Sequence, residues 1–134
     1  MKVGDYVRID GYISKIEHLK TSSSGKTYAQ WKQPNGMLAS ANIIIIDEFS
    51  QNIIDLIVKD DLLKIIYPIG REKDLFQEEV TQVIENEDNK LYIKLYTERY
   101  VLLENLSRYD IKIKSIVTKE QFENMQYIVE SDKQ

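Results

Sequence analysis

The chain has 134 residues, of which 43% are hydrophobic and 30% charged, and its formal net charge is −4. This balance is typical of a folded globular protein and excludes a disordered chain, while the length fits one domain or two very small ones. No apolar run approaches the roughly 20 residues that cross a bilayer, and the first ten residues lack the apolar segment of a secretory signal. The absence of cysteine excludes disulfides and thiolate chemistry. We therefore expect a cytoplasmic protein.

Residues 3–16 predict two short strands. The stretch "VGDYVRI" alternates, with Val3, Val7 and Ile9 on one face and Tyr6 and Arg8 on the other, and "YISKI" repeats the habit. Such alternation is typical of strands that bury one face.

The stretch "TSSSGKTY" at 21–28 ends like a phosphate-binding loop, but Lys20 occupies the position that the first glycine needs. The residues after it alternate like a strand, whereas a nucleotide-binding loop opens a helix. We interpret residues 22–25 as a flexible hairpin loop and exclude a nucleotide hydrolase.

The run "NIIIID" at 42–47 has two interpretations: a strand buried on both faces, or an edge strand that pairs with another chain. We favour the buried strand, because an exposed row of isoleucines would aggregate. In "FSQNIIDLIVKDD", Ser50 as a cap and Ile53, Ile54 and Ile57 at helical spacing predict one or two helical turns.

The second half contains further strands and one helix. "KLYIKLY" and "DIKIKSIV" alternate, and Thr118 followed by Gln121 matches a capping box. This motif predicts a helix over 119–125 in which Phe122 and Met125 pack inward. A closing strand through 127–129 and a frayed tail at 131–134 are expected after it.

An internal echo relates the two halves. "VGDYVRIDGYISKIE" opens the chain, and "VKDDLLKI" at 58–65 with "EVTQVIE" at 79–85 repeats its scheme of Val, then Asp, then two alternating strands. We therefore predict a mainly β protein with two small SH3-like barrel or curled-sheet modules in tandem, over residues 1–50 and 51–130.

The segments "MKVGDYVRI", "NIIDLIVKDDL" and "IKSIVTKEQFENMQYIV" resemble small phage- and prophage-encoded proteins of low-GC Gram-positive bacteria. Those proteins commonly open with "VGDYVR", carry "NIIDLI.VGD" at mid-chain and close with "IKSIVTKEQFE". The likeness covers the start, middle and end of the chain, but not 19–50 or 66–110. "VKDD" departs from the pattern because it lacks the glycine before the aspartate. The resemblance implies a phage origin and the module type.

Catalytic chemistry finds little support. His18 is the only histidine, and the adjacent carboxylate pairs at 47–48, 60–61 and 78–79 point to opposite faces if they lie in strands. We expect no enzyme, no cofactor and no metal site.

Two groups of residues are candidates for binding. In the first half, rings and cations that stack on bases and follow phosphates predict a nucleic-acid or nucleotide site: Tyr28, Trp31, Lys26 and Lys32. The alternative is that Trp31 belongs to the core. In the acidic second half, tyrosines suited to a protein interface are Tyr92, Tyr96, Tyr100 and Tyr109.

These observations favour a non-catalytic phage-encoded binding protein, active in the cytoplasm of the infected or lysogenic bacterial host. We expect it to inhibit a host antiviral defence, in the manner of anti-CRISPR proteins, by binding an effector complex or sequestering a signalling nucleotide. The alternatives are a single-stranded nucleic-acid-binding accessory protein and a phage structural or morphogenetic component.

Overall fold

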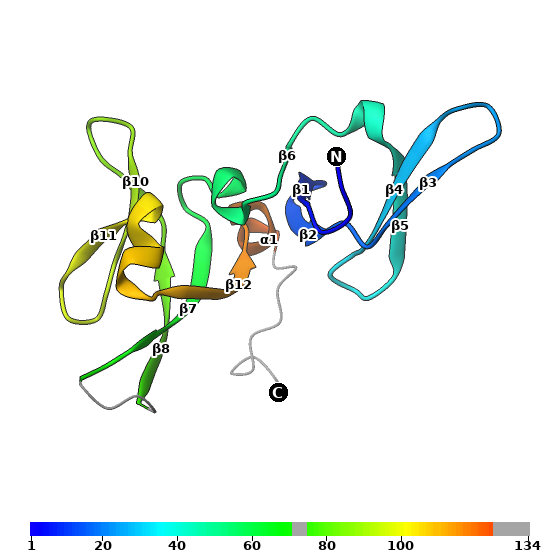
Figure 1. Ribbon diagram of the computed structural model, residues 1–134. Coiled ribbons are helices and arrows are strands. Elements are labelled where there is room, and N and C mark those ends of the chain that lie inside the picture. The colour runs from blue at the N-terminus through cyan, green and yellow to red at the C-terminus, as the bar shows by residue number, and fades with distance from the viewer. Residues whose placement is uncertain (71–74, 125–134) are drawn as a thin grey trace, which may run out of the picture. The chain divides into compact units, whose positions relative to one another are not determined.

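The computed structural model describes residues 1–70 and 75–124 (Figure 1). The chain divides into two compact units, Met1–Ile57, here called unit 1, and Val58–Gln134, called unit 2. This division falls a few residues after the expected boundary at residue 50, and the assignment of the two parts as separate modules stays a prediction. The protein is mainly β, as predicted. Its described strands form four three-stranded antiparallel sheets and no closed barrel.

Unit 1 contains two of these sheets, with strand orders β2-β1-β6 and β3-β4-β5. Its elements in chain order are β1 (Tyr6–Ile9), β2 (Tyr12–Lys15), β3 (His18–Thr21), β4 (Thr27–Lys32), β5 (Leu38–Asn42), the 3-10 helix η1 (Ile43–Ile45), β6 (Phe49–Ser50) and the 3-10 helix η2 (Ile53–Leu56).

The core of unit 1 lies between its two sheets. It is formed by Val7, Tyr12, Ile16, Ala29, Trp31 and Ile46. The indole N–H of Trp31 donates a hydrogen bond of 2.8 Å to the hydroxyl of Tyr12, so the polar atom of this buried ring has a partner. The predicted alternation is confirmed within β1, because Val7 is fully buried while Tyr6 and Arg8 on the other face are not. Val3, which was expected on the buried face, precedes the strand in a turn and is 59% exposed.

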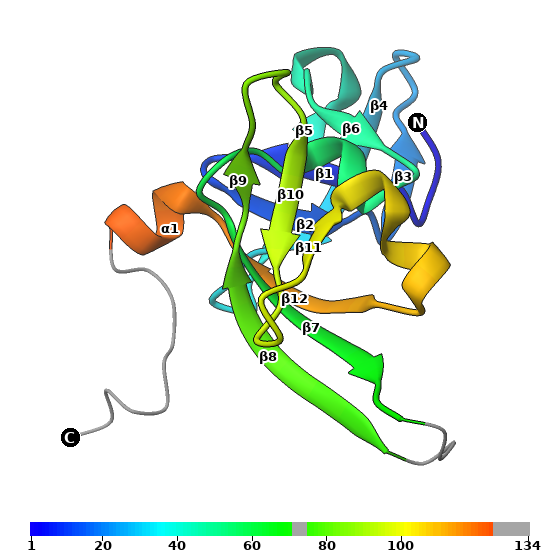
Figure 2. The same cartoon turned by 90° about the vertical axis from the view of Figure 1, so that its left-hand side faces the viewer.

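Unit 2 contains the sheets β12-β7-β8 and β11-β10-β9, the second of which is seen in Figure 2. Its elements are β7 (Leu62–Pro68), β8 (Phe76–Gln82), β9 (Ile84–Glu85), β10 (Leu91–Lys94), β11 (Tyr100–Leu102), the 3-10 helix η3 (Leu103–Tyr109), β12 (Lys112–Val117) and the α-helix α1 (Lys119–Glu123).

The two units have the same connectivity. In each, a first hairpin is followed by a three-stranded meander, a 3-10 helix and a last strand that returns to pair with the first one. The strands β1 to β6 therefore correspond in order to β7 to β12. The internal echo in the sequence reflects this repetition.

The correspondence extends to the turn that opens each unit. The carboxylates of Asp5 and Asp61 each accept a hydrogen bond of 2.9 Å from the backbone N–H three residues earlier. The carbonyl of the same aspartate then accepts from Ile16 in unit 1 and from Val83 in unit 2, at 2.7 and 2.8 Å. The missing glycine in "VKDD" therefore leaves the turn intact.

Three turns carry a glycine in unit 1 and a residue with a side chain in unit 2. Each pair has matching backbone hydrogen bonds, and each residue has a positive φ, the region that glycine adopts most easily. The pairs are Gly4 (φ 96°) with Asp60 (75°), Gly25 (85°) with Asn89 (61°), and Gly36 (87°) with Glu98 (70°).

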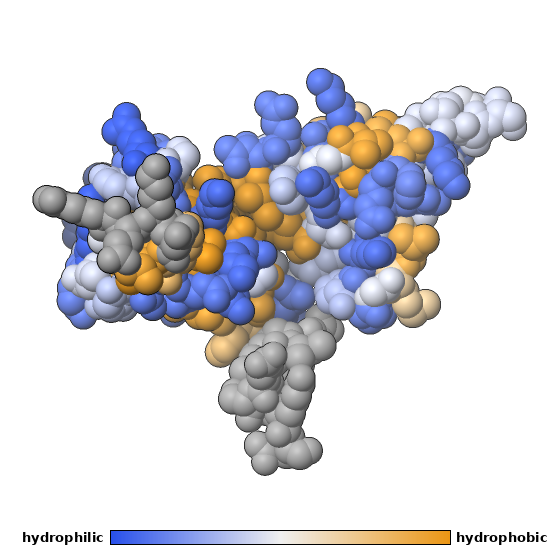
Figure 3. Space-filling view, turned by 60° about the horizontal axis from the view of Figure 1, so that its bottom comes forward, coloured by the Kyte–Doolittle hydropathy of each residue, from blue (hydrophilic) through white to orange (hydrophobic). Residues whose placement is uncertain are grey.

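The prediction of a buried strand at 42–47 is wrong. The side chain of Asn42 accepts from the N–H of Ile44 and begins the 3-10 helix η1. Only Ile46 is buried, whereas Ile44 is 80% exposed. Figure 3 shows that hydrophobic residues, in orange, reach the surface of the protein among hydrophilic ones. A tight helical turn cannot bury consecutive residues on one side, so the four isoleucines point in different directions.

Two helix predictions need smaller corrections. The turn after Ser50 is η2, and its cap is Asn52, while the hydroxyl of Ser50 donates to Asp55. The capping box of Thr118 and Gln121 is confirmed at the start of α1. Phe122 is exposed and Gln121 is buried instead, which corrects the expected inward face. Met125, the strand expected at 127–129 and the tail lie outside the described residues.

Candidate binding surfaces

The second sheet of unit 2 carries tyrosines on its outer face. Along β10, Ile93 is buried, so Tyr92 and Lys94 on either side of it point outward. The register pairs Lys94 with Tyr100 and Tyr92 with Leu102, which places both tyrosines on the same face of neighbouring strands.

Tyr92 and Tyr100 on this face contact each other, and cations lie beside the rings of Tyr100 and Tyr109. Tyr92 and Tyr100 meet edge to face, with ring centroids 5.4 Å apart. The Nζ atom of Lys94 lies 5.7 Å from the centroid of Tyr100, and the guanidinium of Arg99 lies 4.3 Å from that of Tyr109. These contacts favour the observed positions of the rings at the surface. We call these five residues the tyrosine surface.

Charges at the rim of the tyrosine surface are paired. Glu98 bonds to Lys94 and raises the pKa of that amine above its ordinary value. Lys90 approaches Glu104 at 4.0 Å. The charges of Lys94 and Lys90 are therefore compensated, while the guanidinium of Arg99 lies over the ring of Tyr109.

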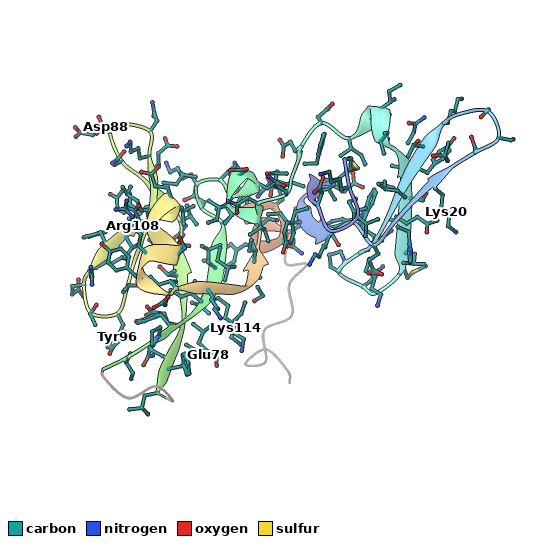
Figure 4. The ribbon with its side chains drawn as sticks, viewed as in Figure 1. Lys20, Glu78, Asp88, Tyr96, Arg108 and Lys114 are labelled. Carbon is teal, nitrogen blue, oxygen red and sulfur yellow. The ribbon has the colours of Figure 1, made fainter. Side chains whose placement is uncertain are left out.

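Tyr96, the fourth tyrosine predicted for this site, lies apart from the others. Its backbone N–H donates to both carboxylate oxygens of Glu79, which also accepts from the hydroxyl of Tyr67. The exposed ring of Tyr96 projects near the turn after β10 (Figure 4). The structure therefore brings together Tyr92 and Tyr100, sets Tyr109 beside Arg99, and leaves Tyr96 outside the tyrosine surface.

The outer face of the sheet β3-β4-β5 in unit 1 holds part of the other predicted site. Tyr28 and Lys32 lie on this face because Ala29 and Trp31 alternate with them and point into the core. Lys26 is exposed in the hairpin loop just before β4. Trp31 is only 2% exposed, so it is a core residue and its ring is not available to a ligand.

Lys20 also belongs to this outer face, and the sequence reasoning missed it. The register places it directly opposite Tyr28 on the neighbouring strand β3, and Figure 4 shows it on the hairpin. The predicted loop at 22–25 would have placed Lys20 opposite Thr27. The observed loop is one residue longer, because Thr21 pairs with Thr27, and this register brings Lys20 opposite Tyr28.

Within residues 1–70 and 75–124, no three or more His, Asp and Glu side chains gather closely enough to hold a metal ion. No helix in the same ranges has the length and apolar character needed to span a membrane.

No protein-family model matches this chain, and neither does any curated protein or solved structure.

Proposed function

We propose that this protein is a phage-encoded binding protein that acts without catalysis and inhibits a host antiviral defence complex. The observation that carries the proposal is the tyrosine surface, where Tyr92, Tyr100 and Tyr109 are held at the surface by ring and cation contacts. Tyrosine is enriched at the centres of protein interfaces because it buries a large area at a low cost in side-chain entropy. The sequence resemblance supports the phage origin.

The same proposal includes the module type. Each unit is an SH3-like module, a small curled sheet in which the last strand returns to the first after a 3-10 helix. The shared connectivity supports this assignment. Modules of this size act as rigid supports for a binding face, which is the role we give to the sheet of β9, β10 and β11.

The test is complex formation with purified defence complexes, CRISPR effectors first, followed by size-exclusion chromatography and by plaque assays in cells carrying the same system. We expect co-elution and protection of the phage. Replacing Tyr100 with Ala should weaken the complex at least about 30-fold if this residue is an interface hot spot. Phe76→Ala is the matched control, because Phe76 is equally exposed, at 56% against 57%, but lies outside the tyrosine surface.

Two results would contradict the proposal. One is the absence of any complex together with unprotected phage. The other is self-assembly of the purified protein, detected by light scattering, which would instead support a structural phage component.

A further inference from the structure

The outer face of the sheet β3-β4-β5 differs in composition from the rest of the protein. Strand alternation and register define its members, and each of them faces away from the core of unit 1. They are His18 and Lys20 on β3, Tyr28, Gln30 and Lys32 on β4, and Leu38, Ser40 and Asn42 on β5. We call this set the lysine–tyrosine face.

The lysine–tyrosine face carries no carboxylate, although acidic residues outnumber basic ones in the chain, 22 to 18. Among the described residues, neither Lys20 nor Lys32 takes part in a salt bridge. The corresponding face of unit 2 is different, because its Lys94 is neutralised by Glu98. The lysine–tyrosine face therefore keeps uncompensated positive charge that can attract an anion.

The arrangement of the side chains favours a polymer over a single small anion. Side chains on one face of a strand repeat at about 7 Å. Tyr28, Gln30 and Lys32 therefore follow one another along β4, with Lys20 beside Tyr28 on the next strand. The face presents a ring for stacking, an amide for hydrogen bonds and ammonium groups for phosphates. These are the parts with which sheets bind unpaired bases.

Two other partners fit these observations less well. A duplex keeps its bases stacked inside, so Tyr28 would have no base to stack on. An acidic protein segment would be attracted to the lysines, but it offers no flat partner for the half-buried ring between them. The chemistry is best matched by an exposed, flexible chain that carries both phosphates and unstacked bases.

We propose that unit 1 binds single-stranded nucleic acid on the lysine–tyrosine face, with Tyr28 stacking on a base and Lys20 and Lys32 contacting phosphates. This function is separate from the protein contact assigned to unit 2. The protein then carries two binding faces of different specificity on equivalent sheets.

The test measures the fluorescence anisotropy of labelled oligothymidylate and oligouridylate titrated with the full chain at about 50 mM salt. The label is placed on the nucleic acid because Trp31 is buried and its emission is not expected to report binding. We expect Tyr28→Ala to weaken binding about tenfold. Lys20→Glu combined with Lys32→Glu should abolish binding. The double change to Gln should lower the slope of log K against log salt by about 1.4, since each phosphate contact to a single strand contributes about 0.7.

The matched control is Lys64→Glu combined with Lys112→Glu, which makes the same change in net charge but in unit 2. Apart from the weakening that any loss of positive charge causes, this control should bind the oligonucleotide within about twofold of the wild-type affinity. Trp31 emission and circular dichroism verify that each variant is folded. The proposal is overturned if the wild-type chain binds neither oligonucleotide at low salt, or if the unit 1 variants bind like the control. If polyglutamate displaced the labelled oligonucleotide as well as unlabelled oligonucleotide does, the proposal would be overturned in favour of an acidic protein partner. Tighter binding of a duplex than of a single strand would overturn it as well.

Discussion

Units 1 and 2 build the same turns from different residues. Where unit 1 has Gly4, unit 2 has Asp60, and the hydrogen bonds around the two positions are alike. The backbone conformation is thus imposed by the hydrogen bonds that close each turn and by the strands on either side. Glycine makes the conformation inexpensive, but it is not required for it.

The units also use the equivalent aspartate differently. In unit 1, one carboxylate oxygen of Asp5 accepts from the N–H of Lys2. In unit 2, Asp61 is fully buried, and its second oxygen accepts from the N–H of Lys119 at the start of α1. The additional helix of unit 2 is therefore attached to the turn that opens the unit. This difference can be tested by substitution.

The largest expected effect is that of Asp61→Asn compared with Asp5→Asn. An asparagine has a single acceptor oxygen, which suffices at position 5 but leaves one buried N–H unsatisfied at position 61. We expect a loss of about 2–3 kcal/mol in the stability of unit 2 and less than about 1 kcal/mol in unit 1. Amide hydrogen exchange of β7 measures unit 2, and denaturant unfolding followed by Trp31 fluorescence measures unit 1. Equal losses at the two positions would show that α1 adds nothing to the turn.

The next effect concerns the core of unit 1. Tyr12→Phe removes the acceptor of the buried Trp31 N–H and should lower the stability of unit 1 by about 1–2 kcal/mol. Tyr6→Phe is the control, because its ring remains available to the Lys15 ammonium group that lies 5.6 Å from the centroid. Both are measured by urea unfolding of the Trp31 signal. A Tyr12 variant as stable as the control would mean that water replaces the lost hydroxyl.

The third effect is a pH dependence confined to unit 2. Burial and the hydrogen bond to Glu79 raise the pKa of Tyr67 above its ordinary value of 10.0. A folded-state pKa above the unfolded one means that this stabilisation is complete below pH 10 and is lost as the pH rises beyond it. The slope is about 1.4 kcal/mol per pH unit. The stability of unit 2, measured by hydrogen exchange of β7, should no longer fall with this slope in Tyr67→Phe. In Tyr92→Phe the slope should remain.

The smallest effect concerns the turns themselves. Gly36→Ala should destabilise unit 1 by about 1 kcal/mol, because a Cβ at this position meets no atom within 4 Å and only the backbone conformation opposes it. Glu98→Gly at the equivalent position should stabilise unit 2 by up to about 1 kcal/mol, since the exposed ion pair with Lys94 that it removes is worth little. Asn89→Gly should gain less, because asparagine tolerates a positive φ. A loss of stability in Glu98→Gly would show that the side chain supports its turn.

Local sequence patterns predicted the strands, the capping box and the repetition, because alternation and turn chemistry depend on neighbouring residues. The placement of Trp31 required the pairing of strands. It shares its face with Ala29, a residue too small to show the burial by itself. The four isoleucines were misjudged because hydrophobicity alone does not distinguish a buried strand from a short helical turn. The signal for a helical turn was Asn42, because asparagine often caps the start of a helix.

Only part of the tyrosine surface could be predicted, because alternation within a strand is visible in the sequence and contacts between elements are not. The alternation in "KLYIKLY" places Tyr92 on the face opposite Ile93, and β10 has this arrangement. The contact of Tyr92 with Tyr100 depends on the register between β10 and β11, and the contact of Tyr109 with Arg99 depends on the path of η3. Both contacts depend on tertiary structure, which the pattern within a single strand does not predict.

The carboxylate of Asp61 has a further consequence for protein engineering. It joins the backbone N–H of Val58, at the beginning of unit 2, to that of Lys119, near the end of the described chain. The first residue of unit 2 and the start of its last described helix are thus close in space, and short distances between terminal segments favour circular permutation. We expect unit 2 to tolerate a link between these segments together with an opening in the exposed turn at 96–99. The order of its strands would then change while their neighbours stay the same.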